Sequence, residues 1–285
     1  ELWEADGWHV IECDGHAYQK LYDALKEASE YDGCAVVLCR TVIGKGVSFM
    51  QNIPEYHGKP VPDELLPQAL TELGGDMADY EKVLEMRKGP LPKGREVKPE
   101  AVSVDVGEPR TYAAGEKMDN RGAFGKALAD VGSLNCGKEG RTPLLVFDCD
   151  LAGSVKVDGF AKVCPQCFHE MGIQEHATAT AAGAASTAGC VSVWADFGVF
   201  ASDEVYNQQR LNDINCANLK AVLTHTGLDV GEDGKTHQCI DYLGLFRNDF
   251  GWKVVVPADP NQTDRAVRWM LTEPGCVCLA MGRSK

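Results

Sequence analysis

The strongest constraint on the fold is a strict alternation of apolar runs and helical segments in the second part of the chain. From Asn120 onward, continuously apolar runs of strand length are separated by stretches with helical periodicity. This pattern is typical of a parallel sheet covered by helices on both faces. We therefore predict an α/β fold with a doubly wound, mostly parallel sheet. The expected strands are PLLVFDCDL (143–151), VSVWADF (191–197), LKAVLTH (219–225), KVVVPA (253–258) and CVCLAM (276–281).

The first part of the chain contains a separate helix and strand. Residues 17–31 have helical spacing, and CAVVLCR (34–40) is typical of a buried strand. The stretch 88–117 combines Pro, Gly and Lys with weak periodicity, which indicates an interdomain linker. We expect a partial α/β domain over 1–87, the linker over 88–117 and a complete domain over 118–285.

Charge and cysteine usage limit the partners and the compartment. The net charge of −14 would repel a nucleic-acid backbone or an anionic membrane, and no apolar run has the length of a membrane span. We therefore expect neither as a partner. The twelve cysteines are scattered through apolar segments, where Cys behaves as a small buried hydrophobe. This usage predicts a reducing, cytoplasmic location.

One pair of cysteines has a spacing that metal sites use. Cys164 and Cys167 are separated by two residues, but a structural zinc site needs a second Cys or His pair at suitable spacing. No such pair is evident. We predict no metal ligand here, and the role of the two cysteines stays open.

Glu175 is the first candidate for proton chemistry. It lies in MGIQEHATATAAGAA (171–185), where nearly every neighbour is small or apolar. A carboxyl group in such tightly packed, partly dry surroundings can hold and deliver a proton near neutral pH. The alternative is a first-turn glutamate that the helix dipole stabilises. These residues alone leave both interpretations open.

Two histidines flank an acidic, Gly-rich turn directly after an expected strand. His225 and His237 enclose Glu232 and Asp233 in LTHTGLDVGEDGKTHQC (223–239). Imidazoles transfer protons at neutral pH, and parallel sheets bind ligands beyond the carboxyl ends of their strands. A plain surface loop would explain the glycines but not both histidines. We predict a functional loop.

Two phenylalanines follow the expected strand 191–197. Phe197 and Phe200 could present a ring at the mouth of the sheet, where it would stack on a planar heterocycle. Phe-x-x-Phe at helical spacing is more often part of a core. The residues alone therefore favour a core role.

Together, these motifs resemble the transketolase family. GWHVIECDGH, RTVIGKGVSF, YHGKP, DCDLAGS, MGIQEH, THTGL, GEDGKTHQ, VPAD and GRSK occur in an order typical of transketolases, over nearly the whole chain. GEDGKTHQ and MGIQEH are the most specific. The resemblance implies the thiamine-diphosphate-binding fold, with the end of the diphosphate-binding domain over 1–87 and the pyrimidine-binding domain over 118–285.

The resemblance also implies an activity and a cofactor. A transketolase transfers a two-carbon ketol unit, glycolaldehyde, from a ketose phosphate to an aldose phosphate with thiamine diphosphate, in the pentose phosphate pathway. By resemblance, Glu175 bonds N1′ of the aminopyrimidine. Phe200 stacks on that ring and Phe197 lines the same pocket, which reverses the preference for a core role at Phe200.

The resemblance assigns the remaining site residues to the cofactor and the sugar. Asp150 lies close to the cofactor, and His57 touches both the cofactor and the sugar. His225, Asp233 and His237 bind and shuttle protons at the sugar hydroxyls and carbonyl. The phosphate clamp consists of Arg121, Ser154 and Arg283, and the planar fork of Arg suits that task.

The chain also departs from the family pattern. The Gly-Asp-Gly motif and downstream Asn that hold the metal and diphosphate do not occur. We therefore expect Mg²⁺ or Ca²⁺ with ligands outside this chain, and a homodimer or a complex with the missing domains on another chain. Position 203, aromatic in some relatives, is Asp.

Three alternatives remain. Related ketol enzymes of the deoxyxylulose-phosphate synthase or dihydroxyacetone synthase type share the fold and the glutamate. A non-catalytic assembly or regulatory subunit would keep the fold without needing this set of residues. A plain nucleotide-binding module is disfavoured because no GxGxxG or P-loop spacing follows a strand.

Overall fold

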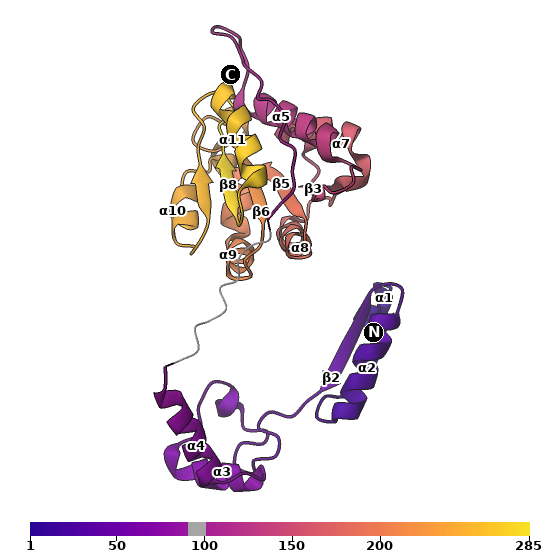
Figure 1. The fold of residues 1–285 in the computed structure, drawn as a ribbon, viewed down its shortest axis with the longest axis vertical. Coiled ribbons are helices and arrows are strands. Elements are labelled where there is room, and N and C mark those ends of the chain that lie inside the picture. Colours follow the sequence, from indigo (N-terminus) through magenta and orange to yellow (C-terminus); the bar gives the residue numbers. More distant parts are fainter. Residues whose placement is uncertain (91–100) are drawn as a thin grey trace. The chain divides into compact units, whose positions relative to one another are not determined.

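The computed structural model describes residues 1–90 and 101–285. The chain divides into two compact units, Glu1–Gly94 and Arg95–Lys285, each with its own sheet (Figure 1). Residues 91–100 of the predicted linker lie outside the described residues.

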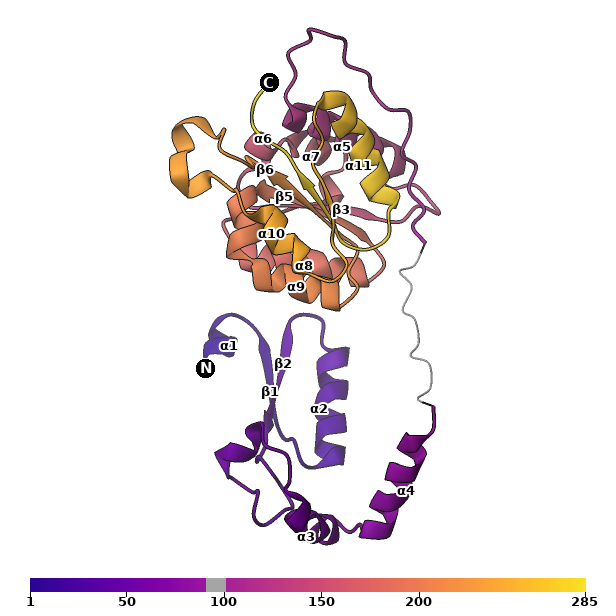
Figure 2. The same ribbon diagram turned by 90° about the vertical axis from the view of Figure 1, so that its left-hand side faces the viewer.

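The first unit contains a two-stranded parallel sheet. α2 (Tyr18–Glu30) connects β1 (His9–Asp14) to β2 (Ala35–Arg40) and packs beside them (Figure 2). A crossover of this kind is needed because parallel strands cannot be joined by a tight turn. The other helices of this unit are α1 (Leu2–Ala5), η1 (Pro54–His57), η2 (Asp63–Leu65), α3 (Leu66–Glu72) and α4 (Met77–Lys88).

The second unit has a six-stranded, entirely parallel sheet in the order β4-β3-β5-β6-β8-β7. Five of its strands coincide with the predicted runs. The sixth, β4, was not predicted because it is a three-residue edge strand without an apolar run. The strands are β3 (Leu144–Asp148), β4 (Phe168–Glu170), β5 (Val191–Phe197), β6 (Leu219–Thr224), β7 (Lys253–Val255) and β8 (Val277–Ala280).

Helices cover both faces of this sheet, which confirms the doubly wound fold (Figure 1). One face carries α5 (Asn120–Asn135), α7 (Asp158–Val163) and α11 (Pro260–Thr272), and the other carries α8 (Glu175–Thr187), α9 (Tyr206–Ile214) and α10 (Tyr242–Arg247). Short turns are α6 (Ala152–Val155), η3 (Pro165–Cys167), η4 (Val199–Glu204) and η5 (Gly231–His237). No helix in the described ranges combines the length and apolar composition needed to cross a bilayer.

Small residues let α8 lie close to its neighbours. A Cβ atom at Gly183 would overlap the Asn212 side chain of α9, and Asn212 Nδ2 donates to the carbonyl of Ala179 at 3.1 Å. Ala179 and Ala182 are completely buried in the core on this face. The Ala-rich sequence therefore fixes α8, and with it Glu175 at its first position.

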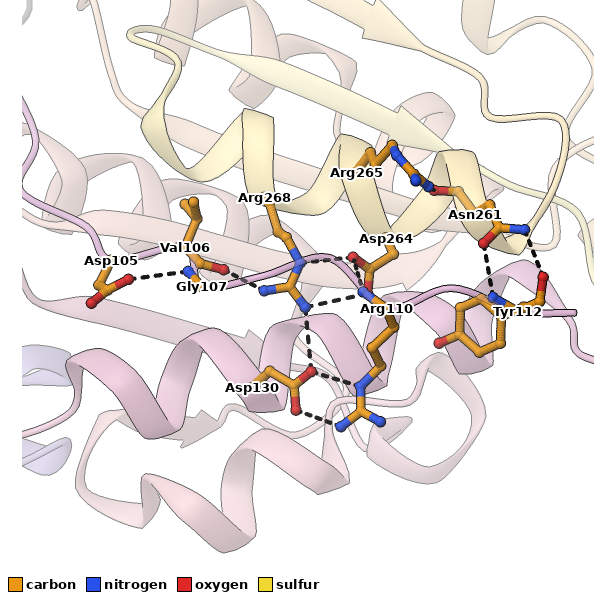
Figure 3. Close-up of polar contacts among 10 residues, drawn as sticks. All are labelled: Asp105, Val106, Gly107, Arg110, Tyr112, Asp130, Asn261, Asp264, Arg265 and Arg268. Atoms are coloured by element: carbon orange, nitrogen blue, oxygen red, sulfur yellow. Dashed lines mark hydrogen bonds and ion pairs between the residues drawn. The ribbon is translucent and has the colours of Figure 1, made fainter.

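The described end of the predicted linker is bound to the second unit. Arg268 of α11 donates to the carbonyl of Val106 and pairs with Asp264 at 2.7 Å and Asp130 at 3.3 Å (Figure 3). Arg110 forms a two-pronged pair with Asp130 at 2.6 and 2.7 Å. This Arg–Asp network fastens the segment around residue 110 to α5 and α11.

Hydrogen bonds between the backbone of this segment and side chains of α11 extend the attachment. The Tyr112 N–H donates to Asn261 Oδ1 at 2.8 Å, and Asn261 Nδ2 donates back to the Tyr112 carbonyl at 3.1 Å (Figure 3). The Arg110 N–H donates to Asp264 Oδ1 at 3.1 Å. Through these bonds the polar side chains of α11 pair with a segment that has no regular structure of its own.

Candidate active site

The predicted site residues of the second unit gather where its parallel strands end. β3 ends at Asp148, β5 at Phe197 and β6 at Thr224, and these strands are hydrogen-bonded neighbours. Glu175 begins α8, and Arg283 follows β8. The carboxyl edge of the sheet is thus the predicted place for a ligand.

Two phenylalanines and two histidines form a continuous ring cluster at this edge. The Phe197 and Phe200 rings are stacked, with centroids 6.0 Å apart and planes at 16°. The His225 ring lies 3.9 Å from Phe197, and the His237 ring lies 5.4 Å from Phe200. The structure therefore brings the motif that was expected to face a heterocycle, Phe197 and Phe200, together with the two histidines that were expected to act on the sugar.

Phe200 occupies an irregular turn. It lies in η4, a π-helical turn that follows β5, and such turns occur frequently at functional sites. Phe197 is 8% exposed, while Phe200 is half-buried and packs against the core. The Phe197 ring is therefore mainly part of the core, whereas the Phe200 ring packs on the core and is also accessible at the edge.

His225 is buried and tied to Arg121. Arg121 Nη1 lies 3.3 Å from His225 Nε2, and Thr224 Oγ1 lies 2.9 Å from the other ring nitrogen. Burial, followed by the charges of Arg121 and Arg283, lowers the pKa of His225 to about 4. The imidazole is therefore neutral at pH 7, so one of its nitrogens accepts a hydrogen bond.

Arg121 is oriented from two sides and keeps one unsatisfied group. Its Nη2 pairs with Asp119 at 3.0 Å, and its Nη1 donates to the Ser154 carbonyl at 3.2 Å. Its Nε is buried without a partner. The Ser154 side chain is exposed, so only the backbone of Ser154 contacts Arg121 here.

Arg283 binds the acidic turn of the functional loop. It pairs with Asp233 at 3.2 Å and Glu232 at 3.4 Å and donates to the Val230 carbonyl. Asp233 is thus held by an arginine of the predicted phosphate clamp. Ion pairs therefore connect the 231–237 turn to Arg283.

Carboxyl groups crowd the ends of β3 and β4. The exposed Asp150 has a left-handed φ of 61° and donates its N–H to Glu170 at 2.8 Å. Burial, followed by a hydrogen bond with Glu170, raises the pKa of Asp148 to about 7. Oδ1 of Asp148 is buried without a partner.

Glu175 is buried at 8% exposure. One of its carboxyl oxygens, the Cys149 sulfur and a carboxyl oxygen of Asp196 all lie within 4.8 Å of one another. Asp196 is completely buried, and burial, followed by the charge of Glu175, raises its pKa to about 8. Glu175 is therefore a buried acid beside a second buried acid.

His57 lies in the first unit. It ends η1 and is exposed. The other predicted site residues all lie in the second unit.

The cysteines show a feature that was not predicted. Cys136 and Cys164 form a disulfide across 28 residues, so Cys164 is not simply a buried hydrophobe. The sulfur of Cys167 lies within 4.8 Å of both. Local spacing revealed only the Cys164–Cys167 pair because Cys136 comes from the end of a different helix.

The described residues include three groups of side chains that could surround a metal ion. Each contains at least one cysteine, whereas Mg²⁺ and Ca²⁺ prefer oxygen ligands. The groups are Cys136, Cys164 and Cys167; Cys149, Glu175 and Asp196; and Asp203, Cys239 and Asp241.

Sequence reasoning missed three acidic residues of this edge. Asp119 orients Arg121, Glu170 bonds the Asp150 backbone, and Asp196 lies beside Glu175. A signal for Asp196 was present, because an acid inside the apolar run VSVWADF needs an explanation. Asp119 and Glu170 had no such signal.

Comparison with known protein families identifies this arrangement. Residues 116–285, more than half of the chain, match the family described as the transketolase pyrimidine-binding domain. The chain belongs to the transketolase family. Residues 1–88 also match the transketolase thiamine-diphosphate-binding domain. The resemblance predicted from the motifs is confirmed.

Individual transketolases match over nearly the whole chain. It is 27% identical to the transketolases of Homo sapiens and Mus musculus over 286 aligned residues, which cover 98% of this chain and 43% of each relative. The chain therefore spans less than half the length of these relatives.

Solved transketolase structures confirm the fold. The transketolase of Campylobacter jejuni superposes with a TM-score of 0.75 at 23% identity, covering 99% of this chain and 47% of that one. A split-gene transketolase, described as an inactive beta4 tetramer, has a TM-score of 0.51 at 33% identity and covers 59% of this chain and 53% of its own.

Proposed function

We propose that this transketolase-family chain is the pyrimidine-binding part of an enzyme that transfers a two-carbon ketol unit from a ketose phosphate to an aldose phosphate with thiamine diphosphate. The observation that carries the proposal is the buried Glu175 carboxyl at the same sheet edge as the Phe197–Phe200 ring pair and the neutral His225. The match of residues 116–285 to a pyrimidine-binding domain supports it.

The edge residues fit the aminopyrimidine of the cofactor. A flat aromatic heterocycle can stack on the half-buried Phe200, and Glu175 can hold or deliver a proton at a ring nitrogen. When bound, thiamine diphosphate supplies the carbanion chemistry. Phe197 would line the pocket, and Asp150 would lie close to the cofactor.

The basic residues fit a sugar phosphate. The Arg121 Nε has no partner, and the Arg283 side chain is about one-third exposed, so both can serve an incoming anion together with Ser154. His225, a neutral imidazole whose Nε2 accepts from Arg121, would lie at the sugar hydroxyls, and His237 would shuttle a proton at the carbonyl. Asp233 holds Arg283 in place and binds a further hydroxyl.

The proposal takes the remaining cofactor ligands from outside these 285 residues. They do not contain the Gly-Asp-Gly motif, so residues beyond them would hold Mg²⁺ or Ca²⁺ and the diphosphate. His57, in the part that matches the diphosphate-binding domain, would contact cofactor and sugar in a homodimer or in a complex with the missing domains. The split-gene transketolase is a precedent for division into separate chains.

We also place the enzyme in the cytoplasm. Ten cysteines are free, as expected in a reducing compartment. The Cys136–Cys164 disulfide is the one observation that does not follow from this placement.

Complementation tests the proposal. The chain is mixed with a polypeptide that supplies the Gly-Asp-Gly segment, together with thiamine diphosphate, Mg²⁺, a ketose phosphate and an aldose phosphate. We expect two-carbon transfer only when both polypeptides are present. A complex that forms without any transfer would favour the non-catalytic subunit, and transfer to an acceptor other than an aldose phosphate would favour a related ketol enzyme.

A further inference from the structure

The completely buried Asp196 has an unsatisfied carboxyl oxygen. It lies near the end of β5, where its Oδ1 accepts the Phe197 N–H at 2.7 Å. Its Oδ2 is buried and has no hydrogen-bond partner among residues 1–90 and 101–285. A buried carboxyl group without a cation or donor is costly in its charged form, so this position requires a physical reason.

Two neighbouring side chains of Asp196 carry no positive charge that could neutralise it. They are the carboxyl of Glu175 on α8 and the thiol of Cys149 after β3, all within 4.8 Å of one another. In the described part of the chain, no ion pair involves Glu175 or Asp196. Two carboxyl groups this close in a dry site do not both ionise.

We propose that Asp196 is a positioning residue for Glu175: it stays protonated at neutral pH and places a neutral carboxyl group, rather than a second negative charge, within 4.8 Å of the Glu175 carboxyl. This inference rests on the proposed function of Glu175. The proton on Asp196 is additional to the one that Glu175 exchanges, so the pair would hold two protons before a transfer and one after it. With the Glu175 proton on a ring nitrogen, the neutral Asp196 leaves the remaining carboxylate without a second negative charge beside it, and that proton would return to Glu175 when the ring nitrogen releases it.

The surroundings of Asp196 agree with a neutral acid. Burial, then the charge of Glu175 and more weakly that of Asp148 on β3, raise its pKa to about 8, while hydrogen bonds from the Phe197 N–H and from Cys149 act in the opposite direction. On the other side, Thr224 of β6 bonds only the Asp196 backbone carbonyl, at 3.2 Å. Apart from the Phe197 N–H, the thiol of Cys149 is thus the donor that the described residues offer to the Asp196 carboxyl.

A carboxyl titration of the chain itself tests this inference. The aspartate side-chain carbons are labelled with carbon-13, and their NMR shifts are followed from about pH 5 to about pH 10. We expect one aspartate to lose its proton near pH 8 and this signal to disappear in Asp196→Asn. In Glu175→Gln the same titration should move to lower pH by about one unit, because the neighbouring charge is gone.

Asp148→Asn is the matched control, because Asp148 is a second buried acid on the adjacent strand whose pKa is raised to about 7. This variant should remove its own titration and lower that of Asp196 by less than Glu175→Gln does, because the charge of Asp148 acts more weakly on Asp196 than that of Glu175. Asp196→Thr also removes the carboxyl and serves for the assignment if Asp196→Asn does not fold.

Two results would overturn the inference. In one, the Asp196 carboxyl is ionised throughout the range. In the other, its titration is unchanged in Glu175→Gln, which would make it a structural acid unrelated to Glu175. The titration needs neither cofactor nor partner, so failed two-carbon transfer with a normal titration counts against the proposed function alone.

Discussion

The second unit holds buried acids in two different surroundings, one beside arginines and one without a cation among the described residues. In the Arg–Asp network, Asp264 and Arg268 face each other at 2.7 Å with 0% and 6% of their side chains exposed. At the carboxyl edge, Asp196 is equally buried but has no cation beside it within the described residues, and Oδ2 of Asp196 and Oδ1 of Asp148 have no partner.

The Arg–Asp network uses its charges to hold the structure together, whereas the acids at the carboxyl edge can take up and release protons. In the network, each carboxylate is neutralised by an arginine, and the product is a fixed chain segment beside α5 and α11. At the edge, burial, followed by neighbouring carboxyl groups, raises the pKa of Asp148 to about 7 and that of Asp196 to about 8, so these two acids can exchange protons near neutral pH. Buried acids without a cation therefore distinguish Asp148 and Asp196 at the edge from Asp264 in the network.

Breaking the network should produce the largest change in stability. Arg268→Met leaves the buried Asp264 as an uncompensated charge, and we expect the free energy of unfolding of the second unit to fall by about 3–5 kcal/mol. Denaturant unfolding followed by circular dichroism measures this loss. Arg265→Met on the same helix removes only a bond to the Asn261 carbonyl and should stay within about 0.5 kcal/mol. Equal losses of unfolding free energy in Arg268→Met and Arg265→Met would contradict the stabilising role of the Arg–Asp network.

The two clusters should also respond to pH in opposite directions. Burial raises the pKa of Asp196 to about 8, from 3.8 in the unfolded chain, so the folded state binds more protons and stability falls as pH rises between these values. Asp196→Asn should therefore be more stable than the wild type by about 1–3 kcal/mol at pH 8, with the gain vanishing near pH 4.

Asp130 gives the opposite sign in the same measurement. Its hydrogen bond to Arg110 lowers the pKa of its carboxyl, so its contribution is present above pH 3.8 and is lost as pH falls through the folded-state value. Asp130→Asn should cost stability at neutral pH and nothing in strong acid. Parallel pH profiles for the two variants would contradict the assignment.

Much of the fold could be predicted because its signal is local. Apolar runs such as VSVWADF and helical spacing in α5 and α11 need only neighbouring residues, and the edge with Glu175, His225 and His237 follows from where such strands end. The Arg110–Asp264 bond joins residues 154 apart, and the Cys136–Cys164 disulfide joins helix ends. No local period encodes such pairings, so the attachment of the linker segment and the disulfide came only from the structure.

Two-carbon transfer by Glu175→Gln in the complemented enzyme measures whether the Glu175 carboxyl carries the proton. This variant keeps the size of the side chain but cannot hold or deliver the proton. We predict that turnover falls by about 100-fold or more, while complex formation and the unfolding profile stay close to the wild type. Turnover near that of the wild type would contradict the account of this edge as the proton-transfer site.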